Sequence, residues 1–238
     1  MAIHVASDTS SFGGAAVHEQ PRRKPNMHRL QHKVALLCDR LSLGEDERRG
    51  IRRQFQKILN TPLPPDMTDV AVVMKREKFF PRRSGYGDQL SALSRMLPRH
   101  QLPVNDRLGV CSGVREIEQK ERILNQLAKE QPGRFLFIPT REGEAETSIG
   151  DVMEQFSPDE FCFGIWEYEC SALASYKRMR NRIFLALHDE VVNRTNGKFT
   201  HCASVSFRDN ELRIGRIPHA RGNGPLVIRY HYTVGGSY

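Results

Sequence analysis

The hydrophobic pattern changes its period at Gly197, and this change constrains the fold more than any other feature of the sequence. Beyond it, apolar and polar residues alternate, which is typical of strands with one buried face. The predicted strands are Phe199–Phe207, Leu212–Ile217 and Leu226–Val234, with a tight Asp209-Asn210 turn between the first two. Three such strands in succession predict an antiparallel meander in the C-terminal region.

A long helix is predicted directly before these strands, over Ala172–Val192. Its apolar residues recur every three or four positions, which places them on one stripe of a helix. The stripe consists of Tyr176, Met179, Ile183, Leu187 and Val191. We therefore expect the meander to pack on this helix, in a chain of the α+β class.

The N-terminal part of the chain is predicted to be helical. Apolar residues follow helical spacing in His28–Leu41, and again in a second helix that begins at Glu45. The segment Thr61–Asp66, which reads TPLPPD, ends this pair of helices and is a candidate linker. Residues 27–65 are therefore a candidate helical subdomain of a single α+β domain over residues 27–238. Residues 1–26, rich in Ser, Gly and Ala, are interpreted as a disordered arm.

The middle of the chain mixes short elements of both kinds. Buried strands are predicted at Val70–Met74 and Phe135–Ile138, and helices at Gln89–Leu97 and Val114–Ala128. An acidic loop over residues 141–159 is expected to contain a short helix around Val152. The aromatic segment Phe161–Cys170 fits either a strand or the start of the following helix, and the pattern leaves both open.

Composition indicates an intracellular protein without a membrane span. No apolar run approaches the roughly 18 residues of a membrane helix, so no integral membrane contact is expected. The first ten residues lack the basic head and apolar core of a secretory signal. Five cysteines at irregular spacing argue against a disulfide framework and for a reducing compartment such as cytoplasm or nucleus.

Charge is segregated along the chain. The whole sequence contains 36 Lys and Arg against 28 Asp and Glu, for a net charge of +8. Residues 21–100 hold 18 of those basic residues and 8 acidic ones, whereas residues 141–170 hold 1 basic and 9 acidic residues. A basic excess of this size attracts polyanions. The other interpretation is that the acidic block folds against a basic one and neutralises it.

Three basic clusters lead to the prediction of a nucleic-acid-binding protein, with RNA favoured over DNA, that catalyses no reaction. Cations bind phosphates, and aromatic side chains stack on unpaired bases. The predicted contact residues are Arg48, Arg49, Arg52, Arg53, Lys75, Arg76, Phe79, Phe80, Arg82, Arg83, Arg178 and Arg182. Viral RNA-handling proteins and pathogen effectors often have this composition. Against the prediction, Glu45 and Asp46 are placed to neutralise Arg49 and Arg53, and the two phenylalanines equally suit the core.

Two alternative predictions are enzymatic, a cysteine phosphatase and a metal-dependent nuclease. Residues 201–208 fit the HC-x5-R spacing of cysteine phosphatases, with Cys202 as nucleophile and Arg208 as phosphate ligand. That chemistry needs a loop followed by a helix, whereas the residues here continue a strand pattern. Asp159, Glu167 and Glu169 are candidate Mg²⁺ ligands of a nuclease.

The remaining class is a protein–protein interaction module, whose acidic and basic blocks complement a partner or a second copy of the chain. The sequence contains no CxxC pair, no HExxH and no glycine-rich nucleotide loop. No cofactor and no metal are therefore expected.

Overall fold

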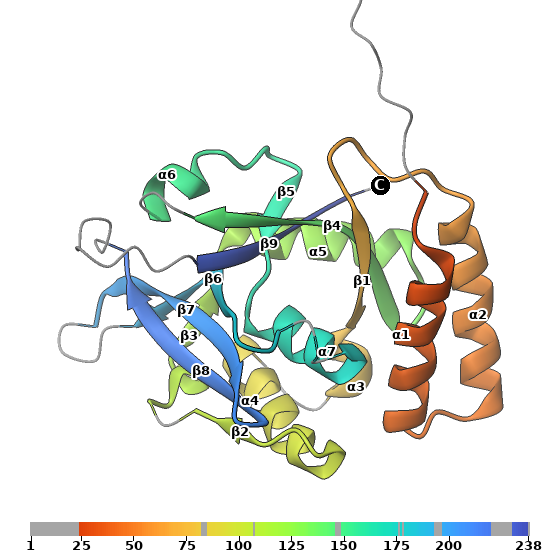
Figure 1. The fold of residues 1–238 in the computed structure, drawn as a ribbon, viewed down its shortest axis with the longest axis horizontal. Helices are drawn as coiled ribbons and strands as arrows, with labels where there is room; N and C mark the ends of the chain where they lie inside the picture. The colour runs from red at the N-terminus through yellow and green to blue at the C-terminus, as the bar shows by residue number, and fades with distance from the viewer. Residues whose placement is uncertain are drawn as a thin grey trace, which may run out of the picture.

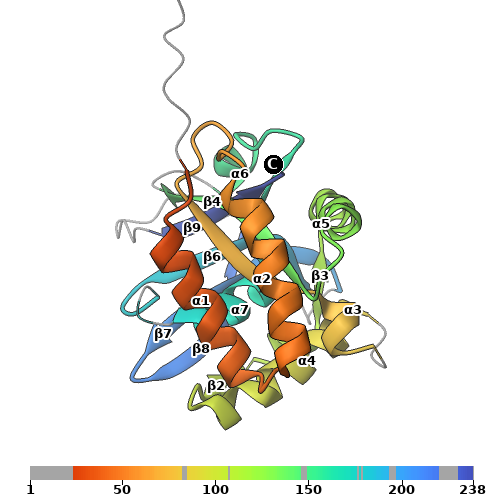
Figure 2. The ribbon, with the colours of Figure 1, turned by 90° about the vertical axis from the view of Figure 1, so that its right-hand side faces the viewer.

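The computed structural model describes residues 24–81, 85–106, 108–145, 149–175, 177, 179–192, 197–219 and 230–237. The predicted disordered arm lies outside these residues except for its last three. Figures 1 and 2 show a mixed α+β chain, in which helices pack around a large, mostly antiparallel sheet. The predicted fold class is confirmed. No helix in the described part of the chain is long and apolar enough to cross a membrane.

Two helices open the described chain and lie side by side at the β1 edge of the sheet (Figure 2). These are α1 (Met27–Arg40) and α2 (Glu45–Leu59), close to their predicted bounds. The Asn26 side chain caps α1 by accepting a hydrogen bond from the backbone of Arg29 at 3.0 Å. The apolar stripes of both helices belong to the same buried cluster as the central strands.

The elements that follow α2 alternate in kind. The strands are β1 (Asp69–Met74), β2 (Val104–Asn105), β3 (Val114–Glu116), β4 (Phe135–Ala145) and β5 (Glu160–Cys162). The helices are α3 (Arg76–Phe79), α4 (Tyr86–Met96), α5 (Glu118–Glu130) and α6 (Ile149–Met153), with 3-10 turns η1 (Leu97–His100) and η2 (Val110–Ser112). The predicted helix over Val114–Ala128 is therefore preceded by a short strand, and the strand predicted at Phe135–Ile138 runs on into the expected acidic loop.

The predicted long helix over Ala172–Val192 is wrong. The chain forms α7 (Ile165–Ser175) and then the strand β6 (Ile183–Val192). Most of β6 is buried, and its apolar residues form a continuous run that also matches helical spacing. The segment Phe161–Cys170, for which the sequence left strand and helix open, contains both. Its first two residues end β5, and α7 begins at Ile165.

The C-terminal strands form a different meander from the predicted one. Strands β6, β7 (Phe199–Arg208) and β8 (Glu211–Pro218) pair antiparallel in sequence order. The predicted third strand, β9 (Tyr230–Gly236), does not pair with β8. It lies between β4 and β6, in the order β1-β4-β9-β6-β7-β8-β2, with β3 beside β6 and β5 beside β9. The first four residues predicted for it fall outside the described ranges.

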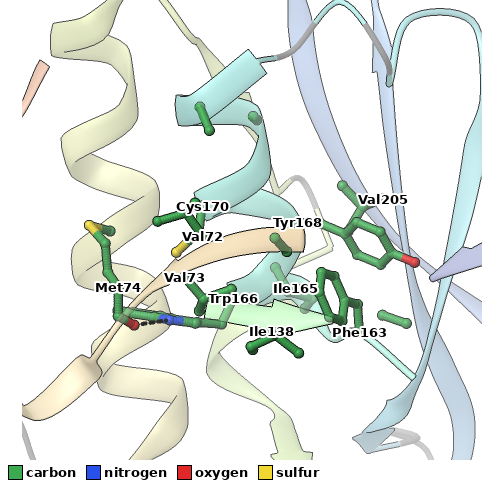
Figure 3. Packing of buried hydrophobic residues seen from close by; sticks show 14 of the residues in the cluster. Val72, Val73, Met74, Ile138, Phe163, Ile165, Trp166, Tyr168, Cys170 and Val205 are labelled. Carbon is green, nitrogen blue, oxygen red and sulfur yellow. Dashed lines mark hydrogen bonds between the residues drawn. The ribbon is translucent and has the colours of Figure 1, made fainter. Parts of the chain in front are cut away.

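The core lies where α7 meets the sheet. Nine of the eleven residues of α7 are buried, so this helix is enclosed on nearly all sides. Figure 3 shows Trp166 reaching from α7 to β1, where its indole Nε1 donates a hydrogen bond to the carbonyl of Met74 at 2.8 Å. Phe163 and Tyr168 pack edge to face on the other side, with ring centroids 5.9 Å apart. These contacts hold α7 firmly against the sheet.

Candidate nucleic-acid interface

Helix α2 presents one continuous cationic face to solvent. Its acidic residues are confined to the first turn, and Ile51, Phe55 and Ile58 are buried against the sheet. The exposed side chains recur at the three- and four-residue spacing that places them on one side of a helix. They are Arg49, Arg52, Arg53, Gln56 and Lys57, and we call them the α2 face. Two of these cations, Arg53 and Lys57, also border a groove of about 710 Å³ between α2 and the end of α5.

Two arginines of the α2 face have acidic partners on the same helix. Arg49 pairs with Asp46, and the Arg52 Nη2 atom lies 3.6 Å from Glu45 Oε2. Both carboxylates are highly exposed, with 91 % and 76 % of their side-chain surface accessible. Exposed pairs of this kind contribute at most about 1 kcal/mol, so a phosphate competes with them readily. Arg53 makes no ion pair with any part of the chain that the structure describes.

Arg48, predicted to contact phosphate, instead ties α2 to the end of α1. Its guanidinium donates to the carbonyls of Leu43 at 2.8 Å and Cys38 at 3.2 Å, and to Asp39 at 2.8 Å. The hydrogen bond to Asp39 raises the pKa of Arg48 above its ordinary value. Because each of its three guanidinium nitrogens donates a hydrogen bond within the protein, Arg48 is structural, and we leave it out of the interface.

The cluster around Phe79 and Phe80 packs in part against the core. Lys75 is only 4 % exposed, and its Nζ donates to the carbonyls of Ala128 at 2.9 Å and of Gln131. Phe79 packs on Phe135 with ring centroids 5.5 Å apart, and Phe80 packs edge to face on Trp166 at 5.9 Å. The predictions that Lys75 binds phosphate and that the phenylalanines stack on bases are therefore not supported by these positions.

Of the other arginines predicted to contact phosphate, the structure describes Arg182 but not Arg82, Arg83 or Arg178. Arg182 lies before β6 and pairs with Glu142 at 3.1 Å, with 42 % of its side chain exposed. Arg82, Arg83 and Arg178 lie outside the described residues. The α2 face is thus the one predicted cluster whose cations the structure places together on an exposed surface, within the part of the chain that it describes.

Arg76 belongs to a buried ionic network. It pairs with Glu116 at the end of β3, and its guanidinium lies over the ring of Tyr86, 4.9 Å from the centroid. The same carboxylate lies 3.2 Å from the Nζ atom of Lys120 in α5. Both Arg76 and Glu116 are mostly shielded from solvent, with 18 % and 6 % of their side chains exposed. Arg76 is therefore not available to a polyanion.

Lys120 stands at the centre of this network and is completely buried. Its Nζ lies 2.7 Å from Glu167 Oε2 and 3.0 Å from Asp189 Oδ1, and both carboxylates are also fully buried. Asp189 accepts further hydrogen bonds from Tyr86 Oη and from the backbone of Ile165, both at 2.6 Å. Burial opposes the charge of Lys120, but the surrounding carboxylates, Asp189 first, leave its pKa above the ordinary value. The network thus joins α3, α4, β3, α5, α7 and β6.

Sequence reasoning missed Lys120, although a signal was present. Lys120 precedes Ile123, Leu124 and Leu127 by three, four and seven residues, which places it on the buried side of α5. A lysine on an apolar stripe requires a buried acidic partner. The partner Asp189 is 69 residues away in the sequence, so spacing alone does not identify it.

Gly164 has no side chain, and the charged groups of this network fill the space where a Cβ atom would lie. A Cβ atom at this position would overlap Lys120 Nζ and both carboxylate oxygens of Asp189. We expect Gly164→Ala to lower the free energy of unfolding by about 1–3 kcal/mol, as overpacking does in a dense interior. Urea denaturation measures this. Gly50→Ala, in the exposed middle of α2 where an added Cβ meets nothing, is expected to stabilise slightly. Equal effects of the two substitutions would contradict this account.

The three acids predicted to bind Mg²⁺ are not gathered into one site. Asp159 is exposed in a turn before β5, whereas Glu167 and Glu169 are buried in α7. Glu169 accepts a hydrogen bond from Ser94 Oγ at 2.5 Å, while Glu167 faces Lys120. No group of three His, Cys, Asp or Glu side chains in the described ranges is arranged to hold a metal ion.

Cys202 and Arg208 are placed unlike the residues of a phosphatase. Cys202 is fully buried in the middle of β7, where its register partners are Glu190 and Ile217. Burial raises the pKa of its thiol to about 12, which disfavours the reactive thiolate. Arg208 is exposed at the end of the same strand, six residues and therefore roughly 20 Å away. At this separation the two side chains cannot both contact one phosphate group.

Comparison with protein-family models, with curated proteins and with solved structures finds no match to this chain. Its function is therefore inferred from the contacts of its own residues.

Proposed function

We propose that the protein binds nucleic acid through the α2 face. The observation that carries the proposal is the exposure of Arg49, Arg52, Arg53 and Lys57 on one side of a single helix. The net charge of +8 adds a long-range attraction for polyanions. Contacts of this kind are made to phosphates, so they position a strand without reading its bases.

The groove beside α2 supports a single strand as the ligand. Arg53 and Lys57 border it on the α2 side, and Arg134 borders it on the other side. Ile51 and Pro132 also line the groove, and they offer apolar surface to an unpaired base. Arg134 is held by Glu47, so it shapes the groove while the cations of α2 supply the charge.

The salt dependence of binding tests the proposal. A fluorescent oligouridylate of about 20 nucleotides should bind with a log–log salt slope of roughly −3, because four phosphate contacts each contribute about −0.7. Affinity then falls roughly 50-fold between about 50 and 200 mM salt. Replacing Arg49, Arg52 and Arg53 together by glutamine should flatten the slope to roughly −0.7. Fluorescence anisotropy measures both quantities.

A matched variant separates this face from net charge alone. Replacing Arg95, Arg99 and Arg122 by glutamine also removes three exposed cations, all of them outside α2. This triple variant should keep most of the salt slope. If both triple variants lose affinity equally, or if the unmodified protein shows no salt-dependent binding, the α2 face is not a nucleic-acid interface.

A further inference from the structure

A cavity of about 320 Å³ lies between α1, α7 and the strands β1, β4 and β9. Helices α1 and α7 lie beside each other in Figures 1 and 2, and α1 also contacts β1. The volume is at the lower end of the range for small-molecule sites. The cavity shares no lining residue with the α2 face, so the two surfaces can be examined independently.

One end of the cavity is cationic. Arg29 and Lys33 are one turn apart on α1, and both approach Asp69 at the start of β1. The Lys33 Nζ atom donates to Asp69 Oδ2 at 3.0 Å and to the carbonyl of Val70 at 2.7 Å. The Arg29 Nη1 atom lies 3.6 Å from the same Asp69 oxygen, beyond hydrogen-bond distance. Two cations therefore approach one carboxylate here, and Lys33 holds it more closely.

The guanidinium of Arg29 is left without hydrogen bonds to the described residues. Its Nη2 atom is shielded from solvent and has no hydrogen-bond partner among the residues that the structure describes, although 34 % of the side chain is exposed. A buried donor without a partner is costly, and a carboxylate is the acceptor that best fits the guanidinium fork. A small turn of Arg29 toward the cavity would satisfy it with a ligand carboxylate.

The other charged residue of the cavity limits the charge of the ligand. Glu142 lines the wall from β4 and is held by Arg182 at 3.1 Å. The formal charges of Arg29, Lys33, Asp69 and Glu142 cancel. The lining therefore has no net positive charge to attract a polyphosphate or a nucleotide. A ligand with a single negative charge suits this balance, because its carboxylate can meet Arg29 without a second anionic group facing Glu142.

The rest of the lining is divided equally between apolar and hydroxyl-bearing residues. The apolar residues are Ala71, Val72, Phe163, Ala174, Met179 and Phe184, and the hydroxyl-bearing ones are Thr68, Thr140, Tyr168, Ser171, Ser175 and Thr233. Such a lining suits a ligand that has an apolar body and a polar group at one end. We propose that this cavity binds a small aromatic or aliphatic monocarboxylate, with its carboxylate on Arg29 and its body against Phe163 and Phe184.

Three probes of the same shape test the proposal on the full chain by isothermal titration calorimetry. They are 3-phenylpropionate, which is anionic, 3-phenylpropanol, which is neutral, and 3-phenylpropylamine, which is cationic. The acid should bind at least about tenfold more tightly than the alcohol, since a charge-assisted pair with arginine is lost in the alcohol. Inorganic phosphate, which lacks the apolar body, should bind more weakly than the acid.

Arg29→Gln tests the assigned partner. This side chain is partly exposed, so the variant is expected to fold, and its thermal midpoint checks that it does. Affinity for 3-phenylpropionate should fall about tenfold, while Arg95→Gln, which removes an exposed arginine from α4, should leave it unchanged. Equal binding of acid and alcohol, undiminished binding to Arg29→Gln, or no binding of the acid at millimolar concentration would each overturn the proposal.

Discussion

Lys120→Met is expected to lower the free energy of unfolding by about 3–5 kcal/mol, the cost of breaking a buried ion pair from one side. Lys120 holds Glu116, Glu167 and Asp189 together, and the last two carboxylates are fully buried. Without the ammonium group these three acids face one another, with Arg76 alone to offset them. Methionine replaces the aliphatic stem, so the loss reports the charge rather than a cavity. Equilibrium denaturation in urea measures it.

Two further variants make this prediction specific. Lys129→Met, at an exposed position of the same helix, should change stability by less than about 0.5 kcal/mol. Adding Glu167→Gln and Asp189→Asn to Lys120→Met should recover part of the loss, because the uncompensated charges are then gone. If Lys120→Met were as stable as Lys129→Met, the network would not be a determinant of this fold.

The free energy of unfolding is expected to fall as the pH rises from about 6.5 to 8, because Glu169 ionises in the unfolded state before it does in the folded state. Burial raises the pKa of this carboxyl group to about 8, so the folded state holds a proton that the unfolded state has already lost. The contribution of Glu169 to stability is therefore complete below its unfolded pKa and declines as the pH rises toward its folded pKa. The decline approaches about 1.4 kcal/mol per pH unit between the two values.

Two other buried groups, Asp189 and His188, titrate mainly below this window. Burial raises the pKa of Asp189 to about 6, and it lowers the pKa of His188 to about 4, which makes stability rise with pH below the ordinary histidine value. Their opposite effects are largely complete about one pH unit above the higher of each pair of pKa values, which is by about pH 7 for Asp189 and about pH 7.5 for His188. Glu169 is therefore the group whose titration dominates at mildly alkaline pH.

Glu169→Gln isolates this effect. The amide oxygen can still accept the hydrogen bond from Ser94, but the side chain no longer ionises. The variant should lose the decline in stability between about pH 6.5 and 8, whereas Glu121→Gln, at an exposed position of α5, should retain it. Urea denaturation at several pH values gives the slopes. A slope that persists in Glu169→Gln would assign the proton to another group.

The cationic face of α2 follows from the sequence alone. The spacing of Ile51, Phe55 and Ile58 determines which side of the helix is buried, and the arginines then fall on the other side. The spacing of residues along the chain could not show that Arg48 has carbonyl partners, or that Phe79 and Phe80 pack on the aromatic rings of other elements. Those contacts are made by residues of other elements, whose positions depend on the fold.

The cavity under α1 illustrates the same limit. Arg29 and Lys33 are one turn apart, so their shared side of α1 is predictable. Their neighbours Glu142 and Phe184 come from β4 and β6, and the latter strand was predicted to be helical. A candidate ligand site assembled from such distant segments is not readable from local patterns.

What the sequence determined by itself is local: the paired helices α1 and α2, the β7–β8 hairpin and the α+β class. The Asp209-Asn210 turn is an example, since both residues adopt the positive φ angles, 51° and 60°, that a tight hairpin turn requires. Only the tertiary structure decided that β6 is a central strand, that β9 inserts between β4 and β6, and that Lys120 meets Asp189. Periodicity reports the side of an element that is buried, whereas strand order and charge pairing depend on which distant segments bury one another.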